Sequence, residues 1–440
     1  MFKTLRNAFK VKDIRNKILY TLAVLVIVRL GSLLPAPAIS SDVTKQFFDL
    51  DALDFFNSLT GGSFTQMSIF ALSITPYISS SIIIQLLTIA IPKLEEMQKE
   101  GEDGRKRIND ITRYLSVGLS VVEALAFAIG FGSSGYLEGG FNFTNVVLIV
   151  VAFTAGATLL MWLGERITQK GVGNGISIIL LFNIVSRMPN DISALYNKFV
   201  NGKQVLNAAF AAIVIIAVML VTIVLVIVLQ DAERHIPVQY AKKVQGRKMV
   251  GGQTSHIPLK VNTAGVIPVI FANSLMTFPI VISSFFGVKP ARAYVWPKIL
   301  KLLHQDSWLV FSSWGEFKYS LGLLIYIALL IFFAYFYTSI TFNPIEVANN
   351  MKKQGGFIPG IRPGKPTTDY LTKVLNNIIF IGAIGLTIVS VIPIFFSGAF
   401  GADVSFGGTS LIIIVGVIIE TIKQIESMLL VRHYKGFLND

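Results

Sequence analysis

The chain has 440 residues, of which 53% are apolar and 14% are charged; since soluble globular proteins have about 25% charged residues, this composition excludes an ordinary soluble domain and indicates lipid as solvent. Its formal net charge is +13, an excess that in a membrane protein indicates orientation, because basic residues gather in cytoplasmic loops. Cysteine is absent, which excludes disulfides, thiolate catalysis and cysteine-bound metals, and the four histidines are scattered without ligand spacing.

Apolar runs of about 20 residues, long enough to cross the hydrocarbon core of a bilayer, recur along the whole chain. They predict ten membrane-crossing helices, near residues 18–34, 68–92, 112–132, 145–164, 174–188, 205–230, 262–284, 319–340, 374–396 and 408–430. The stretch MFKTLRNAFKVKDIRNK is too charged for a signal peptide, so we expect the first helix to be its own insertion signal. The run at 174–188 is short for a crossing and would have to begin inside a funnel or continue past Pro189.

The loops between these runs alternate in charge, which predicts the topology. The N-terminal segment is basic, the loop DVTKQFFDLDALDFF is acidic, the loop after the second span contains Arg105, Lys106 and Arg107, and the next loop has no lysine or arginine. This pattern places both termini in the cytoplasm of an inner-membrane protein. The loop at 285–318 weakens it, since it should be external yet carries basic residues that include Lys289, Arg292, Lys298 and Lys301. Two long, basic cytoplasmic loops, 231–261 and 341–373, are predicted to be ordered and to bind partners.

The two halves of the chain, 1–190 and 191–440, contain similar short motifs in corresponding spans. Pro76-Tyr77-Ile78 in the second span corresponds to Pro268-Val269-Ile270 in the seventh, and GISIIL opens the fifth span as GTSLII opens the tenth. Because five is odd, two five-helix units in tandem have opposite membrane orientations. Inverted repeats whose helices are interrupted by proline or glycine mark a pathway at the repeat interface, since the backbone groups freed there must be satisfied by protein or water.

The repeat nominates apolar side chains for this pathway. A transporter would place charges or ordered polar groups there, whereas a hydrophobic constriction gates by expelling water. Any one of these residues taken alone would more commonly be ordinary core or lipid-facing filler, and the prediction depends on their matching positions. The predicted pore ring consists of Ile74, Ile78, Ile176, Leu180, Ile270 and Ile413.

Polar residues within the spans suggest a second feature. Glu123 lies in the third span, where an ionised carboxylate is costly unless it is partnered or wet; the alternative is that it reaches the membrane interface. Ser79, Gln85 and Asn273 could join it in a hydrogen-bonded seam between helices. GVGNGIS and GIRPGKPT fail as phosphate-binding loops because their spacings are wrong. We expect no cofactor, no metal and no catalysis.

Several long motifs resemble the SecY family of protein-conducting channels. They are SIFALSITPYISSSIIIQLL, TRYLSVGLSVVEAL, GERITQKGVGNGISII, YAKKVQGRKMVGGQTSHIPLKVNTAGVIPVIFANSLMTFP, FNPIEVANNMKKQGGFIPGIRPGKPT and FGGTSLIIIVG. The similarity runs from about residue 10 to 435 and is loose at 40–55 and 285–318. It implies an all-α clamshell of two inverted five-helix halves around an hourglass pore, which passes unfolded secretory polypeptides and releases membrane helices into the lipid bilayer.

The resemblance also implies roles for individual residues. The pore ring falls on the six residues named above, with Leu180 replacing the more usual isoleucine. A half-helix plug matches roughly residues 52–66, including Asn57, Gly61, Gly62 and Phe64. A lateral gate for signal sequences, between spans 2–3 and 7–8, includes Ser79, Gln85, Glu123 and Asn273. The basic loops would dock the SecA motor or the ribosome through Arg247, Lys248, Arg362 and Lys365, and SecE and SecG are the implied membrane partners.

Two other functions stay open on the sequence. A secondary transporter shares inverted repeats and broken helices but needs coordinating charges at mid-membrane, and only Glu123 fits that description. An assembly scaffold or insertase without an open pore would not need apolar residues at symmetry-matched positions.

Overall fold

A computed structural model describes most of the chain. The residues it describes are 2–39, 60–133, 137–138, 140–199, 205–240, 243–245, 248–250, 254–285, 295–304, 308–309, 320–400 and 408–436. The helices are α1 (Phe2–Lys10), α2 (Lys12–Ser32), α5 (Thr75–Ala90), α6 (Pro92–Lys99), α7 (Glu102–Ser133), α8 (Phe143–Lys170), α9 (Gly175–Phe199), α10 (Val205–Asp231), α11 (Ile267–Phe285), α12 (Val295–Leu303), α14 (Leu321–Thr341), α15 (Pro344–Lys353), α16 (Lys365–Phe400) and α17 (Gly408–Gly436).

Each of the ten predicted spans coincides with a helix, namely α2, α5, α7, α8, α9, α10, α11, α14, α16 or α17. Within the described residues, six helices are individually long and apolar enough to cross a bilayer, and the pair α5 and α6, bent by 100°, would be a seventh. The other three fall short for local reasons. Charged residues occupy α2 and the second half of α17, and the apolar part of α11 is short.

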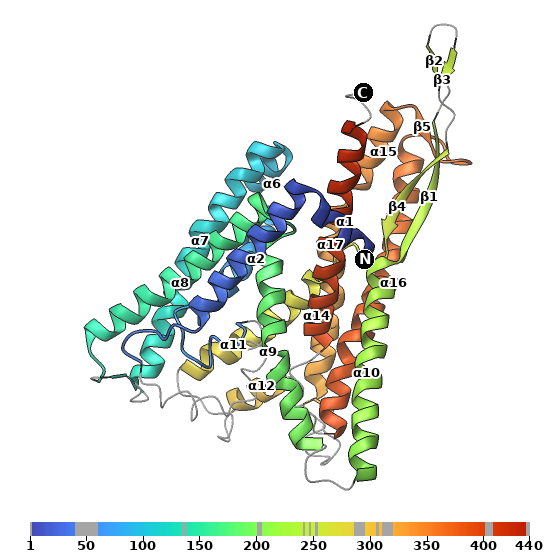
Figure 1. Ribbon diagram of the computed structural model, residues 1–440. Coiled ribbons are helices and arrows are strands. Elements are labelled where there is room, and N and C mark those ends of the chain that lie inside the picture. The colour runs from blue at the N-terminus through green and yellow to red at the C-terminus, as the bar shows by residue number, and fades with distance from the viewer. Residues whose placement is uncertain are drawn as a thin grey trace.

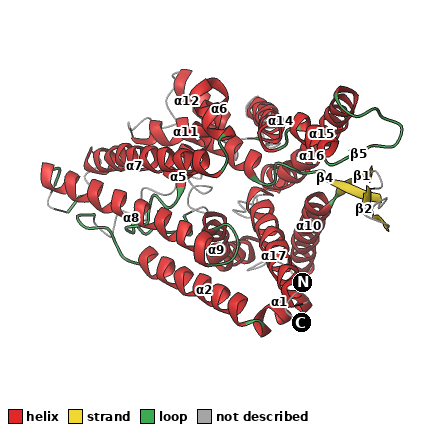
Figure 2. Cartoon of the chain, turned by 90° about the horizontal axis from the view of Figure 1, so that it is seen from above, coloured by secondary structure: helices red, strands yellow, loops and turns green. Residues whose placement is uncertain are grey.

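The helices form two groups with α5 and α9 between them. Seen from above, α2, α7 and α8 lie on one side of the molecule, and α10, α14 and α16 lie on the other (Figure 2). The groups touch where α9 packs against α10 and α17 and where α7 packs against α11. The largest apolar cluster spans this junction, since it contains Leu180 of α9, Ile270 of α11 and Ile413 of α17.

Pro76 and Pro268 act differently from the sequence expectation. They do not interrupt helices; each lies in the first turn, since α5 begins at Thr75 and α11 at Ile267. Proline suits this position because the first-turn N–H has no partner within the helix. The chain before α5, from residue 60 to 74, forms consecutive turns. This non-helical backbone lies inside the protein, where Ala36 N donates to Met67 O (2.8 Å) and Ile69 N donates to Leu34 O (3.0 Å), as membrane depth requires.

The fifth span is longer than its apolar run. Helix α9 continues past Pro189 to Phe199, which is one of the two solutions that the sequence allowed. The boundary expected at residue 190 between the two halves therefore lies inside this helix. Gly175 and Gly408 open α9 and α17, as the GISIIL and GTSLII motifs predict.

The two long basic loops meet in one small sheet outside the helical body. Strand β1 (Glu233–Tyr240) pairs antiparallel with β4 (Thr254–Lys260) on one edge and with β5 (Gly356–Phe357) on the other. A separate hairpin joins β2 (Lys243–Gln245) and β3 (Lys248–Val250). Alternate residues of β1, Ile236 and Val238, pack into an apolar cluster with α15 and α16. The helical fold thus carries strands that the all-α prediction did not include.

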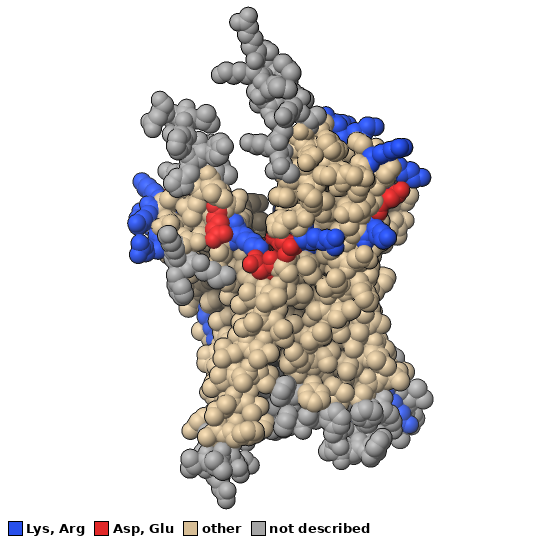
Figure 3. Space-filling model, turned by 90° about the vertical axis from the view of Figure 1, so that its right-hand side faces the viewer, with Lys and Arg blue, Asp and Glu red and all other residues tan. Residues whose placement is uncertain are grey.

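Charge is distributed along the long axis of the molecule. The strands, α1, α6 and the C-terminal end of α17 all lie toward one end (Figure 1). On the face seen in Figure 3, acidic and basic side chains form a band toward that end, and the body below is nearly free of charge. This separation is typical of a protein whose middle lies in hydrocarbon.

Candidate functional site

The six predicted pore residues come together from four helices. Ile74 immediately precedes α5 and Ile78 lies within it, Ile176 and Leu180 lie on α9, Ile270 lies on α11, and Ile413 lies on α17. Spacings of four residues put each pair on one helix face. Five of the side chains are buried in a single apolar cluster, and Ile176, half-buried, packs against it. Segments up to about 340 positions apart in the chain therefore meet in one apolar cluster, at the predicted constriction.

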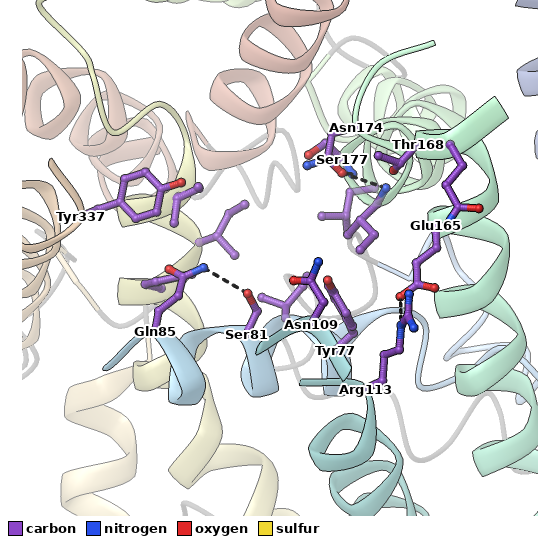
Figure 4. Close-up of a pocket in the computed structure, with 17 residues that line it drawn as sticks. Tyr77, Ser81, Gln85, Asn109, Arg113, Glu165, Thr168, Asn174, Ser177 and Tyr337 are labelled. Carbon is purple, nitrogen blue, oxygen red and sulfur yellow. Dashed lines mark hydrogen bonds and ion pairs between the residues drawn. The ribbon is translucent and has the colours of Figure 1, made fainter. Parts of the chain in front are cut away.

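A cavity of about 470 Å³ adjoins this constriction (Figure 4). Four of the six pore residues line it, namely Ile78, Ile176, Leu180 and Ile270. Ile74 and Ile413 belong to the same apolar cluster without lining the cavity. The remaining wall is mostly polar and includes Ser81, Gln85, Asn109, Asn174 and Ser177. The cavity therefore has polar side chains along much of its wall and branched apolar side chains where it meets the cluster.

An ion pair that sequence reasoning missed lies in the cavity wall. Arg113 of α7 donates through Nε to Oε1 of Glu165 on α8 at 2.6 Å, and through Nη1 to Oδ1 of Asp110 at 2.8 Å. Figure 4 shows the Arg113 and Glu165 side chains pointing toward each other across the two helices. In the sequence, Arg113 and Glu165 are opposite charges at the ends of two successive predicted spans. Charge alone does not identify these two residues as partners.

The predicted lateral-gate residues lie on three neighbouring helices. Ser79 and Gln85 are on α5, Glu123 is on α7 and Asn273 is on α11. Helix α7 packs against both α5 and α11, and α11 packs against α14. Gln85 donates to Ser81 Oγ (3.1 Å) on its own helix rather than across the seam. Asn273 is fully buried and lies beside Tyr326 of α14.

Glu123 is half-buried among apolar neighbours. Within the described part of the chain, no hydrogen bond or ion pair joins it to another side chain, and it does not line the cavity. The hydrogen-bonded seam expected to include Glu123 is therefore not formed by that carboxylate in this arrangement.

Part of the predicted plug lies within the described residues, while Asn57 lies outside them. Gly61, Gly62 and Phe64 lie in consecutive turns rather than in the expected half-helix. Both glycines have left-handed backbones, with φ of 66° and 84°, which only glycine adopts readily. Phe64 is 2% exposed and packs edge-on against Phe127 of α7, with ring centroids 5.3 Å apart.

The predicted partner-binding residues lie in or near the small sheet. Lys248 is in β3, and Arg247 lies outside the described residues. Arg362 is exposed in the turn that leads from β5 into α16, and Lys365 is exposed at the first position of α16. Gly360 and Gly364, with φ of 81° and 103°, shape this turn, and Thr367 Oγ1 donates to the Arg362 carbonyl at 2.8 Å. The turn thus presents the guanidinium to solvent on a defined backbone.

Known proteins match this chain along its full length. A family model described as SecY matches residues 68–422. The protein translocase subunit SecY of Bacillus subtilis is 42% identical over 100% of both chains, and that of Streptomyces coelicolor is 40% identical over 100% of both.

Two solved structures share the fold. One, described as the structure of a protein conducting channel, has a TM-score of 0.63 at 19% identity and covers 94% of this chain and 92% of its own. The other, Sec61 in the canine ribosome-channel complex from the endoplasmic reticulum, has a TM-score of 0.59 at 17% identity with the same coverage.

Proposed function

This chain belongs to the SecY family, and from that premise we propose that its four-helix constriction is the seal of the pore. The chain is a multi-pass membrane protein and a protein-conducting translocation channel rather than an enzyme. The observation that carries the proposal is the convergence of Ile78, Leu180, Ile270 and Ile413 from four helices into one buried cluster beside a polar cavity.

The chemistry of the constriction argues against a transporter. A solute or ion site needs charges or ordered polar groups at mid-membrane, and the six ring positions are aliphatic. The nearby ion pair of Arg113 and Glu165 lies in the cavity wall rather than in the ring. A ring of flexible aliphatic side chains suits a substrate without fixed shape, because it closes around any extended polypeptide and expels water when empty.

The seam between α5–α7 and α11–α14 is the proposed lateral gate. Helices α7 and α11 form the contact across it, and Ser79, Gln85, Glu123 and Asn273 supply polar groups on its helices. A hydrogen bond contributes only about 0.5–1.5 kcal/mol net, so the polar contacts of this seam add little to the free energy needed to part it. Signal sequences and membrane helices would leave through it into lipid.

The partners follow from the small sheet and from the family. The two basic loops form one ordered surface with Arg362 and Lys365 exposed, which suits docking of the SecA motor or the ribosome in the cytoplasm. Sec61 in the canine complex is bound to a ribosome. SecE and SecG would complete the membrane complex, in the inner membrane with both termini cytoplasmic, as the loop charges favour.

Reconstitution tests the function directly. The purified chain, assembled with SecE in vesicles and supplied with SecA and ATP, should carry an unfolded secretory polypeptide into a protease-protected lumen. Deleting residues 55–64 should leave translocation intact and make the vesicles leak small ions, because the proposed plug blocks the pore and does not stabilise the packing of the helices. Vesicles that stay sealed after this deletion would contradict the plug assignment, and a complex that no longer assembles would show that the segment is structural.

A further inference from the structure

Arg29 is a half-buried cation on a helix that is predicted to cross the membrane. It lies in the last turn of α2, inside the predicted span 18–34, where a guanidinium needs hydrogen-bond acceptors because water is scarce. Its Nη1 donates to the carbonyl oxygen of Gly61 at 3.2 Å and to Ser186 Oγ of α9 at 3.4 Å. Among the residues that the structure describes, Arg29 makes no ion pair with a carboxylate.

The carbonyl that Arg29 holds belongs to a tightly fitted turn. Gly61 has a left-handed backbone, and a Cβ added to it would lie 3.0 Å from the Asn183 Cα of α9. Ser186 Oγ in turn donates to the Asn183 carbonyl at 2.8 Å. The carbonyl of Gly61 therefore accepts a hydrogen bond from the Arg29 guanidinium, and its Cα lies close to the backbone of α9.

Asn183 of α9 also contacts the other end of the segment that begins at Gly61. Asn183 Nδ2 donates to Ser73 Oγ at 3.3 Å, directly before the pore residue Ile74. Residues 61–73 thus run from the described part of the predicted plug toward the predicted pore ring. One end is joined to α9 through Arg29, which bonds both Gly61 and Ser186, and the other end is bonded by Asn183 directly. Of these contacts, the one from Arg29 is charge-assisted and reaches across to a different helix.

We propose that Arg29 is a positioning residue that latches the plug segment in the closed channel. Arginine suits the task because it stays charged at any physiological pH and offers several donors. Its acceptors are a carbonyl and a hydroxyl, so the latch lacks the strong Coulomb attraction of an ion pair with a carboxylate and can open. When the segment moves aside, Gly61 leaves, while Arg29 keeps Ser186 and gains water from the opened pathway. The inference depends on the proposed plug.

The test compares Arg29→Met with Arg29→Lys in the complex with SecE in a planar bilayer. Methionine keeps an unbranched apolar side chain and removes the donors, whereas lysine keeps a charged donor. Losing a charge-assisted hydrogen bond should raise the open fraction without substrate by roughly tenfold, equivalent to about 1.4 kcal/mol. Arg29→Lys should lie between the methionine variant and the wild type. The matched control is Arg166→Met, since Arg166 bonds Gln169 and covers the Trp162 ring on the exposed end of α8.

A second readout reports the plug segment itself. Ser63 is 2% exposed, and the chain has no native cysteine, so Ser63→Cys gives a single labelling site. Arg29→Met should raise its rate of labelling by roughly tenfold, the same shift in equilibrium. If Arg29→Met does not assemble, Arg29→Lys, which keeps a charged donor but loses the planar fork, should still raise labelling above the wild-type rate, and an unchanged rate would overturn the latch.

The outcomes separate this inference from the plug assignment. Leak after deletion of residues 55–64, with no change in open fraction or labelling in Arg29→Met, overturns the latch and leaves the plug standing. No leak after the deletion overturns the plug. A latch that acts through the plug also requires that Arg29→Met add nothing to the leak of the deletion variant, and additive leaks would overturn it.

Discussion

Replacing Ile413 by asparagine should unseal the closed channel. Its side chain is 1% exposed and packs in the cluster shared by α5, α9, α11 and α17. Asparagine is smaller than isoleucine, and it brings an amide into a layer whose neighbours are aliphatic. The closed state is therefore destabilised by the full free energy of burying the amide. In an open pore, water can form hydrogen bonds with the amide instead.

The structure sets the size of the effect. Burial of an isoleucine side chain contributes about 1.5–3 kcal/mol, and an amide buried without partners costs a further ~1–3 kcal/mol. Allowing for partial wetting of the cavity nearby, the closed state loses roughly 3–4 kcal/mol relative to the open state. This difference multiplies the ratio of open to closed channels by about 10²–10³.

Single-channel recording of the complex with SecE measures this ratio without substrate, and export of proteins with defective signal sequences measures it in cells. Ile418→Asn is the matched control, because Ile418 lies on the same helix and is 39% exposed. Ile270→Asn should act in the same direction as Ile413→Asn, since Ile270 lines the cavity. The reasoning fails if the Ile413 variant conducts no more than the Ile418 variant and keeps normal signal stringency.

Three further predictions concern other parts of the molecule. In cells whose inner membrane is intact and whose outer membrane alone is permeabilised, an impermeant thiol reagent should label Glu138→Cys and spare Gln354→Cys, and the opposite pattern would reverse the topology. Arg362→Lys should slow SecA-driven secretion in a purified assay while assembly stays normal, because lysine lacks the planar fork of donors; wild-type rates would reduce Arg362 to an orienting charge. Gly175→Ala should lower thermal stability, since its Cβ would lie 1.9 Å from a carbonyl oxygen of α8, whereas Gly118→Ala, with open space around it, should be neutral or stabilising by up to about 1 kcal/mol. Equal melting temperatures of the two glycine variants would contradict the close packing of α8 and α9.

The sequence alone determined the membrane-spanning elements and their number. Whether a segment forms a helix in lipid depends on its own apolar length, because each backbone N–H must bond within the segment. Hence the ten spans and the helix starts at Gly175 and Gly408 could be read from local pattern and internal symmetry, which also predict the set of aliphatic ring residues. Family motifs added the expected function.

Only the tertiary structure decided which distant groups meet. The pairing of Arg113 with Glu165, the grip of Arg29 on Gly61, and the strand β5 that joins the two loops all link segments far apart in the chain. The role of Pro76 was likewise misread, because whether a proline kinks a helix or begins one depends on where the preceding chain can bury its backbone. Such pairings depend on how helices pack, and packing is a property of the whole chain that no local pattern contains.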